Sequence, residues 1–351
     1  MRLLAIGPMK FGSTTVDRLQ ALSDLGFEIV PFDVGLYRDF GMKLERSIAW
    51  RFNTGRAVKK MNEDLIEFSR KTSYDLVWVD KGVWLHLETL DYIKKRAQLK
   101  VAIHYTPDAQ FLSNRSRHFI DCIPTYDLMV TTKPFEIELY KLAKARNVLL
   151  VLQGYGSRFG DADRFVTTQI LSSDLCFVGH CQRHYAKRLK VVAALGFDLK
   201  VWGPRWTRYQ TLHPWARNVV QSDGLWGDEY AKALASAKIG IGLLSKYIPE
   251  TTTTRTFEIP AVGTFMLAER TEDHLSLFEE GKEAEFFSSD AELREKIGYY
   301  VRNDAERAKV ASAGRRRSLI SGYSGHNQMA KIVGELRRLG LTLGANAALV
   351  L

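Results

Sequence analysis

Residues 74–80 read Tyr-Asp-Leu-Val-Trp-Val-Asp, a short apolar run between two acidic residues. A strand that is apolar at successive positions is typical of a parallel sheet covered by helices on both faces. Similar runs recur at 3–6, 28–32, 100–104, 127–131 and 148–152, and amphipathic helical stretches lie between them. This alternation predicts an open parallel α/β sheet through about residue 152.

The same pattern starts again after a loop rich in Gly, Ser and Asp at 153–163. Strands are expected at 174–179, 198–202, 239–243 and 264–268, and helices at 183–195, 228–236, 255–261, 291–302 and 305–320. A chain of 351 residues suits about two domains. We therefore expect two Rossmann-like domains, 1–165 and 166–335, and a tail at 336–351 that is either docked or disordered.

Composition narrows the cellular setting and the kind of partner. The three cysteines are too few for a disulfide framework, which favours a reducing, cytoplasmic compartment. No apolar run reaches the ~18 residues of a membrane span, and the apolar N-terminal run is too short for a signal peptide. The net charge of +10 favours anionic partners, including nucleotides, nucleic acid or the inner membrane face.

Several residues of the first half stand where parallel strands end, the edge at which open α/β sheets bind ligands. His104 and Asp108 follow one strand, and a positioned base there can take a proton from an acceptor hydroxyl. Lys81 follows another strand, and Gly12 lies in the first loop, where a phosphate can approach a helix N-terminus. Turn chemistry and helix capping explain these residues equally well. The spaced glycines of a dinucleotide fold and the P-loop are missing, which weighs against a dehydrogenase and an ATPase.

Cations gather at the start of the second half. Arg183, Lys187 and Arg188 lie on one face of the predicted helix, where they can bind a diphosphate or form an ordinary solvated surface. Aromatic and basic residues alternate through 202–217, a mixture that either stacks on bases or sugars or packs within a loop. The Cys and His residues of 176–184 do not predict a metal site, because they would not converge as paired knuckles do.

The most informative stretch is 249–267, Pro-Glu-Thr-Thr-Thr-Thr-Arg-Thr-Phe-Glu-Ile-Pro-Ala-Val-Gly-Thr-Phe-Met-Leu. The threonines 251–254 offer hydroxyl and N–H groups at a helix start that also carries Arg255, an arrangement suited to an anion. Glu250 and Glu258 lie eight positions apart, and a carboxylate can accept two hydroxyls of a ribose or a sugar. A capped amphipathic helix is the simpler alternative.

Together these residues resemble a GT-B glycosyltransferase, specifically the CgeB-like (spore maturation protein type) family. The resemblance rests on 255–270, on Phe-Glu-Glu-Gly-Lys-Glu at 278–283, on Asp-Ala-Glu-Leu-Arg at 290–294 and on the helices that carry 313–314 and 323–326. It covers most of 170–335 and, more loosely, 75–155. It implies two Rossmann-like domains whose parallel sheets face each other across a cleft, an acceptor-binding first domain, a donor-binding second domain, and catalysis without a bound metal or other cofactor.

The resemblance also implies roles for single residues. Glu258 would hold the donor ribose and Glu250 would lie near the transferred sugar. The loop with Thr252, Thr253 and Thr254, together with Arg255, would face the diphosphate, as would Arg183 and Lys187 or Arg188. Pro260 departs from the family pattern, and a proline is tolerated in the first turn of a helix. An inverting reaction would use Asp108 or His104 as its base, whereas a retaining one needs no strong base, and the sequence does not choose between them.

The expected function is therefore transfer of a sugar from a nucleotide-diphosphate donor to a carbohydrate, lipid-linked or protein acceptor. Glycosylation of DNA bases is an alternative, based on the net positive charge and the aromatic and basic stretch at 202–217. A non-catalytic nucleotide or sugar-binding module is a second alternative. Nucleic acid as a partner and peripheral contact with the membrane are compatible with the sequence but are not favoured.

Overall fold

The computed structural model describes residues 1–10, 12–112, 114–161, 165 and 170–341. The chain divides into two compact units. The first unit consists of residues 1–152 together with the chain from His326 onward, and the second consists of residues 153–325. Each unit is built around its own six-stranded sheet, and in both sheets every pair of neighbouring strands is parallel.

The first sheet has the strand order β2-β1-β3-β4-β5-β6. Its strands are β1 (Arg2–Gly7), β2 (Glu28–Asp33), β3 (Leu76–Asp80), β4 (Val101–Thr106), β5 (Leu128–Thr131) and β6 (Val148–Leu150). The order reverses at β1, which lies between β2 and β3. In open α/β sheets, ligands bind beyond the carboxyl ends of the strands at such a reversal. The stretch that predicted the fold becomes β3, which is buried along its whole length, as its apolar sequence requires.

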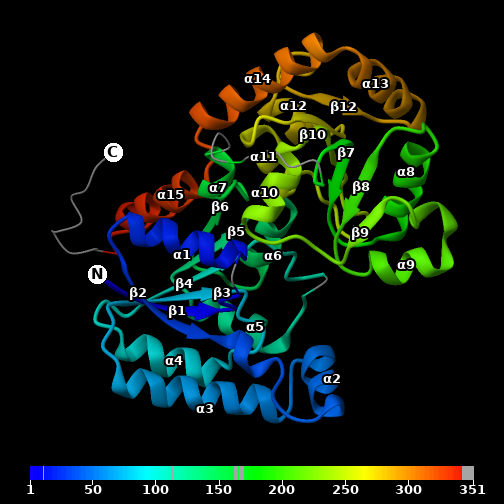
Figure 1. Cartoon of the computed structure of the whole chain (residues 1–351). Coiled ribbons are helices and arrows are strands. Elements are labelled where there is room, and N and C mark those ends of the chain that lie inside the picture. Colours follow the sequence, from blue (N-terminus) through cyan, green and yellow to red (C-terminus); the bar gives the residue numbers. More distant parts are fainter. Residues whose placement is uncertain (11, 113, 162–164, 166–169, 342–351) are drawn as a thin grey trace. The chain divides into compact units, whose positions relative to one another are not determined.

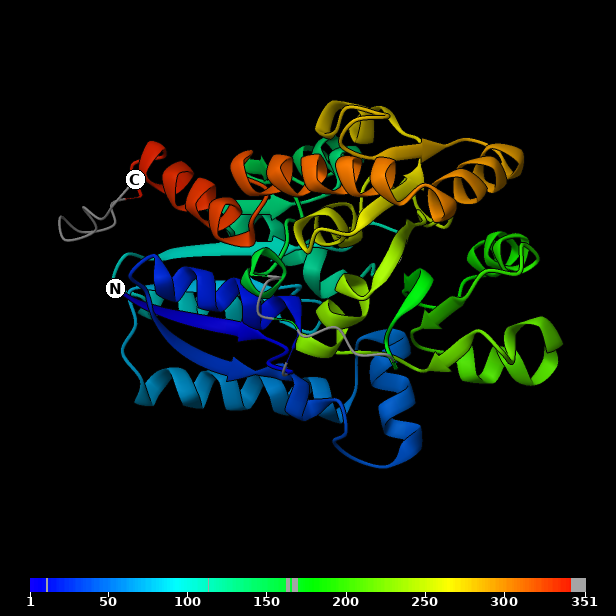
Figure 2. The same ribbon diagram turned by 45° about the horizontal axis from the view of Figure 1, so that its top comes forward.

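Helices cover both faces of this sheet. One face packs against α1 (Thr14–Asp24) and α15 (Gly325–Arg338), and the other against α3 (Arg56–Lys71), α4 (Leu87–Arg96) and α5 (Arg117–Cys122). Figures 1 and 2 show α1 and α3 on opposite sides of β1 and β2. Shorter elements complete the unit: η1 (Val34–Tyr37), α2 (Lys43–Phe52), η2 (Ile123–Thr125), η3 (Pro134–Glu136) and α6 (Ile137–Leu142).

The unit boundaries differ from the expected domains 1–165 and 166–335. The first unit ends at Leu152, and α15 returns to it from the far end of the chain. Met329, Ile332 and Val333 of α15 are buried in the same core as Leu3 and Leu22. The amphipathic pattern of α15 predicts a helix but does not say which sheet the helix covers. Of the expected tail, residues 336–338 form the last turn of α15, and 342–351 lie outside the described residues.

The second sheet has the strand order β12-β11-β10-β7-β8-β9. Its strands are β7 (Ser173–Val178), β8 (Leu199–Trp202), β9 (Val220–Ser222), β10 (Ala237–Gly242), β11 (Phe265–Glu269) and β12 (Glu285–Phe287). The chain moves outward from β7 to β9 on one side and from β10 to β12 on the other. The point of reversal is therefore the pair β7 and β10, which are direct neighbours.

The helices of the second unit are α7 (Ser157–Gly160), α8 (Arg183–Ala193), α9 (Trp206–Leu212), η5 (Pro214–Ala216), α10 (Asp228–Ala235), α11 (Thr254–Ala261), α12 (Glu272–Leu277), α13 (Asp290–Arg302) and α14 (Asp304–Ile320). The sequence patterns predicted α8, α10, α11, α13 and α14. They missed β9, β12, α9 and α12, which are too short to show a period. Pro260 lies in the last turn of α11, not the first, so the expectation for its place in the helix was wrong.

Within the described part of the chain, we find no helix that combines the length and the apolar character needed to cross a membrane.

Candidate functional site

The carboxyl ends of β7 and β10 are joined by one arginine of α11. Arg255 donates a hydrogen bond from Nη1 to the Val178 carbonyl oxygen (3.1 Å) and one from Nη2 to the Leu243 carbonyl oxygen (3.0 Å). Burial lowers the pKa of Arg255, but electrostatic interactions with neighbouring side chains outweigh burial and raise it above the usual value; these neighbours are Tyr185, Tyr230, Glu250 and Glu258. Arg255 is therefore a fixed positive charge at the strand reversal of the second sheet.

Glu258 lies one turn further along α11 and is 4% exposed. Its Oε2 accepts a hydrogen bond from the hydroxyl of Tyr230 on α10 (2.6 Å). Burial and the negative charge of Glu258 raise the pKa of Tyr230 well above its ordinary value, so the phenol keeps its proton. A charged acceptor shortens and strengthens such a bond, which fixes the position of the Glu258 carboxylate.

Glu250 comes from the loop after β10. Its Oε2 accepts the backbone N–H of Ser245 (2.9 Å). In the same loop, Lys246 forms an ion pair with Glu269 at the end of β11. The structure thus brings Glu250, Arg255 and Glu258 to the carboxyl edge of the second sheet. Their roles toward a donor remain predictions.

The threonine loop is tied to a histidine that the sequence did not single out. The Thr253 N–H donates to Thr256 Oγ1 (3.1 Å), and Thr256 Oγ1 lies 2.9 Å from His274 Nε2. His274 Nδ1 lies 2.7 Å from the Glu269 carbonyl oxygen, which can only accept, so Nδ1 carries the proton and Nε2 accepts from Thr256. Burial lowers the pKa of His274, in agreement with this neutral ring. The chain of bonds orders the start of α11, where Thr252 and Thr254 are half-buried and Thr253 is buried.

The three cations of α8 separate into two kinds. Arg188 forms an ion pair with Asp290, the first residue of α13, and lies over the Phe287 ring at 5.9 Å. It joins α8 to α13, so the structure does not support its predicted place beside a donor. Arg183, the first residue of α8, and Lys187 are exposed, and neither makes an ion pair with any residue that the structure describes.

The aromatic and basic stretch at 202–217 is largely loop and helix packing. Trp202 and Trp206 are 3% and 0% exposed, and Trp206 Nε1 donates to the Gly179 carbonyl oxygen (2.8 Å). Tyr209 stacks on His213 with ring centroids 3.8 Å apart. The packing alternative is confirmed for Trp202 and Trp206, because these two tryptophans have no free face on which a base could stack.

The first unit has its own site at the reversal between β1 and β3. Asp80 Oδ2 accepts hydrogen bonds from Arg18 Nη2 (2.6 Å) and Arg18 Nε (3.1 Å), and both side chains are buried. Asp80 Oδ1 is also buried and has no hydrogen-bond partner among the described residues. Gly7, at the end of β1, makes this arrangement fit, since a Cβ there would come within 2.8 Å of Asp80 Cβ.

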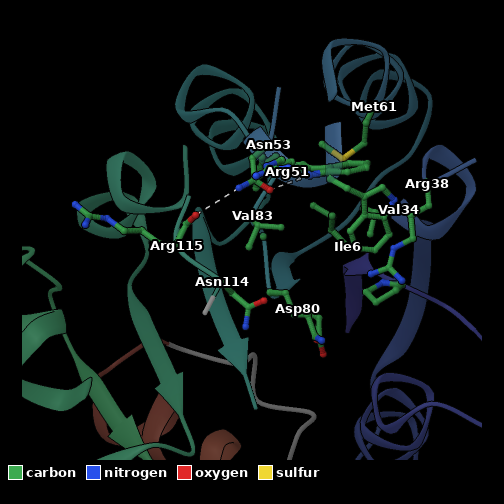
Figure 3. A pocket seen from close by; sticks show the side chains of 16 residues that line it. Ile6, Val34, Arg38, Arg51, Asn53, Met61, Asp80, Val83, Asn114 and Arg115 are labelled. Atoms are coloured by element: carbon green, nitrogen blue, oxygen red, sulfur yellow. Dashed lines mark hydrogen bonds between the residues drawn. The ribbon is translucent and has the colours of Figure 1, made fainter. Parts of the chain in front are cut away.

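A pocket of about 200 Å³ opens above Asp80 (Figure 3). Its lining comes from the ends of β1 and β3 and the loops that follow them, from η1 and the residue after it, from α2 and the residue after it, from Met61 of α3, and from the loop before α5. The aromatic and basic residues of this lining are Arg38, Trp50, Arg51, Lys81, Trp84 and Arg115. Sequence reasoning placed Lys81 here but missed the others. The signal that was available is the basic and aromatic composition of residues 38–52.

The other candidate residues of the first unit have different environments. Asp108 forms an ion pair with Lys81 (Nζ to Oδ2, 2.5 Å), and both side chains are about one-third exposed. Gly12 takes a positive φ of 72° in the turn before α1, a conformation that suits glycine, and brings no polar side chain. Turn chemistry explains Gly12, whereas Asp108 remains a candidate base whose charge is already balanced by Lys81.

His104 does not have the position expected of a catalytic base. It is fully buried in β4, against the rings of Phe119 and Tyr126, and its Nε2 lies 3.0 Å from the Lys81 carbonyl oxygen. Burial lowers the pKa of His104 to about 4, so the ring is neutral at physiological pH. No acceptor hydroxyl can reach a ring in this environment, and the expectation for His104 is corrected to a role in the core.

We expect His104 to make the first unit less stable in acid. Its pKa is about 4 in the folded chain and near 6.5 once unfolded, so the unfolded state binds more protons between these values. The contribution of the neutral ring is complete above pH 6.5 and is lost as the pH falls toward 4, a change of up to about 3 kcal/mol. Chemical denaturation of the protein and of His104→Phe at pH 7 and pH 4.5 measures it, and an equal pH dependence in both would contradict it.

In the described residues, no group of three or more His, Cys, Asp or Glu side chains is placed to hold a metal ion. Cys122 and Cys176 are buried, Cys181 is half-buried, and none of the three forms a disulfide. Burial raises the pKa of Cys181 to about 11, which keeps this thiol protonated and unreactive.

Comparison with known proteins agrees with the two-sheet layout. Residues 183–334 match the family described as "Glycosyl transferase-like". A glycosyltransferase from Rickettsia africae ESF-5 superposes with a TM-score of 0.64 at 14% identity, covering 96% of this chain and 98% of that one. The chain has the GT-B fold, and its similarity to the glycosyl transferase-like family is confined to residues 183–334.

Two further GT-B structures were solved with a donor. The Anabaena protein HepE in complex with UDP-glucose gives a TM-score of 0.61 at 12% identity, with 96% of this chain and 100% of that chain covered. An alpha-glucosyltransferase in complex with UDP-glucose and DNA containing an abasic site gives 0.69 at 11% identity, with 96% and 99% covered. No curated protein matches the chain. The matched family segment contains α8, α11 and the carboxyl edge of β10 and β11, so the GT-B donor expectation and the family match fall on the same unit.

Proposed function

We propose that the protein transfers a sugar from a nucleotide-diphosphate donor, and that the second unit binds this donor at the carboxyl ends of β7 and β10. The observation that carries the proposal is the reversal of strand order between these two strands. Along the chain, α8 is the helix that follows β7 and α11 is the helix that follows β10. Two helix N-termini beside one reversal supply N–H groups and partial positive charge to an anion. Arg183 and Arg255 add full charges at the same edge.

The chemistry of transfer fits these charges. Cleaving a sugar–phosphate bond leaves negative charge on the departing diphosphate, and fixed cations stabilise that charge as it develops. Among the site residues, Arg183 and Lys187 have no ion pair within the described chain, so they are available to a ligand without first breaking a contact. We propose that they supply this stabilisation and that no metal is needed.

In this proposal Glu258, held by Tyr230, binds the ribose, and Glu250 lies near the transferred sugar. The first unit binds the acceptor, with the CgeB-like family as the narrower assignment. DNA as the acceptor has less support in this chain, because two of the tryptophans that suggested base stacking, Trp202 and Trp206, are buried.

Binding of UDP, GDP, ADP and TDP to the full chain, measured by calorimetry with and without EDTA, tests the donor site. We expect one nucleotide to bind regardless of EDTA, and Arg183→Ala to weaken it about tenfold, the size of one charge-assisted contact. Lys190→Ala is the matched control, since Lys190 is exposed further along α8. The absence of binding by all four nucleotides at millimolar concentration, or equal losses in both variants, would contradict the proposal.

A further inference from the structure

The pocket of the first unit carries positive charge that the protein itself does not neutralise. Arg38 and Arg51 line it, are exposed, and form no ion pair with any carboxylate in the described part of the chain. Their neighbours differ in this respect, since Arg46 pairs with Asp39 and Arg56 with Glu45. Unpaired guanidinium groups at a concave site favour an anionic ligand, because the planar fork matches phosphate and carboxylate oxygens.

Aromatic contacts hold one of these cations in place. The Arg38 guanidinium lies over the Trp50 ring at 4.6 Å, and Trp50 packs edge-on against Trp84 at 6.2 Å. Trp84 Nε1 in turn donates to Asn53 Oδ1 (3.1 Å). This series of contacts joins the residue after η1, α2 and the loop after β3 on one side of the pocket, so Arg38 is positioned before a ligand arrives. Figure 3 shows Arg115 directed away from the other labelled side chains, and the inference does not use it.

The floor of the pocket offers a second kind of contact. Asp80 is 3% exposed and lines the pocket, and its buried Oδ1 has no hydrogen-bond partner among the described residues. A buried carboxylate oxygen without a donor is costly unless a ligand supplies one. Because Arg18 occupies Oδ2 and balances the charge of the carboxylate, Oδ1 is the oxygen left to accept a hydroxyl.

We propose that this pocket is the acceptor site and that its ligand is a polyhydroxyl compound bearing a phosphate group. The hydroxyls face Asp80, the phosphate lies between Arg38 and Arg51, and the ring face packs on Trp50. Two unpaired arginines at one pocket suit the two charges of a phosphate monoester better than the single charge of a carboxylate. The assignment of this pocket as the acceptor site rests on the proposed function. The binding of a phosphate-bearing polyhydroxyl compound rests on the residues of the first unit alone.

Calorimetry on the full chain with glucose 6-phosphate, glucuronate and glucose tests the ligand class. We expect glucose 6-phosphate to bind at least tenfold more tightly than either of the others. Arg38→Gln and Arg51→Gln should each weaken it about tenfold, as the loss of a charge-assisted contact does. Arg46→Gln is the matched control on α2 and should leave binding unchanged, since Arg46 lies outside the pocket and is already paired. Equal binding of glucuronate, or equal effects of all three substitutions, overturns the proposal.

A second arm separates a free sugar phosphate from a lipid that carries the phosphate. The lipid is included because the ends of α2 expose apolar side chains outside the pocket. These are Met42, Leu44 and Phe52, which are 73%, 73% and 65% exposed. Flotation with phosphatidylinositol 4-phosphate vesicles, whose headgroup carries both hydroxyls and a phosphate monoester, and with phosphatidylcholine vesicles supplies the lipid. Phosphatidylinositol 4-phosphate binding that is lost in Arg38→Gln/Arg51→Gln supports the phosphate site and assigns the phosphate to a lipid. Binding to both vesicles that the double substitution leaves unchanged overturns the phosphate site as its cause.

Measurements of nucleotide binding distinguish a failure of this inference from a failure of the proposed function. If no nucleotide binds but the binding of glucose 6-phosphate still requires Arg38 and Arg51, the donor proposal fails and the phosphate site stands. If UDP binding is lost in Arg38→Gln/Arg51→Gln and retained in Arg183→Ala, the pocket takes the nucleotide and the acceptor assignment is overturned.

Discussion

Replacing Glu258 with Gln is expected to weaken nucleotide binding by about tenfold to a hundredfold, the range for losing charge-assisted hydrogen bonds to two hydroxyls. Glutamine keeps the volume of the side chain but has no negative charge to offer a ribose. Tyr230 fixes the position of the carboxylate through its 2.6 Å hydrogen bond to Oε2. We therefore attribute the expected loss of nucleotide affinity to the missing negative charge and not to a change in the position of the side chain. Calorimetry with the nucleotide that binds best to the unmodified protein measures the effect.

Tyr230→Phe is the matched control for this prediction. It removes the hydroxyl that holds Glu258 and leaves the carboxylate, so we expect a smaller loss of nucleotide affinity. Thermal unfolding of both variants separates binding from folding, because Glu258 is 4% exposed and can also act as a packing residue. Lower stability with unchanged nucleotide affinity would make Glu258 a structural residue and would refute the ribose assignment.

Replacing Arg18 with Met is expected to lower the free energy of unfolding of the first unit by about 3–5 kcal/mol. Arg18 and Asp80 are 6% and 3% exposed, and the uncharged replacement would leave the Asp80 charge buried without its partner. Arg18 also lies over the Tyr105 ring at 4.3 Å, a contact that a thioether does not reproduce. Hydrogen exchange of β1 and β3 reports on this unit without requiring a single transition for the whole chain.

The matched control is Arg2→Met, which removes an ion pair whose side chains are 38% and 65% exposed. An exposed pair of this kind contributes about 0–1 kcal/mol. The double variant Arg18→Met/Asp80→Leu should recover most of the lost stability, because it removes the buried charge together with its partner. A single Arg18 substitution that costs no more than the Arg2 control would show that water reaches Asp80 and that its carboxylate is not desolvated.

The candidate site was only partly predictable. Glu250, Arg255 and Glu258 lie together because all three flank one strand end, and residues close in sequence are close in space. Arg188 shares the helix face of Arg183 in sequence, yet it turns to Asp290, which is distant in the chain. The sequence suggests that His104 is accessible, because it lies at the end of a strand pattern. In the structure, Phe119 of α5 and Tyr126, the residue after η2, enclose its ring.

The local sequence determined the alternation of apolar strands and amphipathic helices, since the period of hydrophobic residues depends only on the next few positions along the chain. It also determined that two such sheets form. Only the tertiary structure decided that α15 crosses back to the first sheet, that Arg18 neutralises Asp80, and that Arg38, Trp50 and Trp84 enclose one pocket. These contacts join segments tens to hundreds of residues apart, and their energy comes from burial and charge pairing, which no local pattern records.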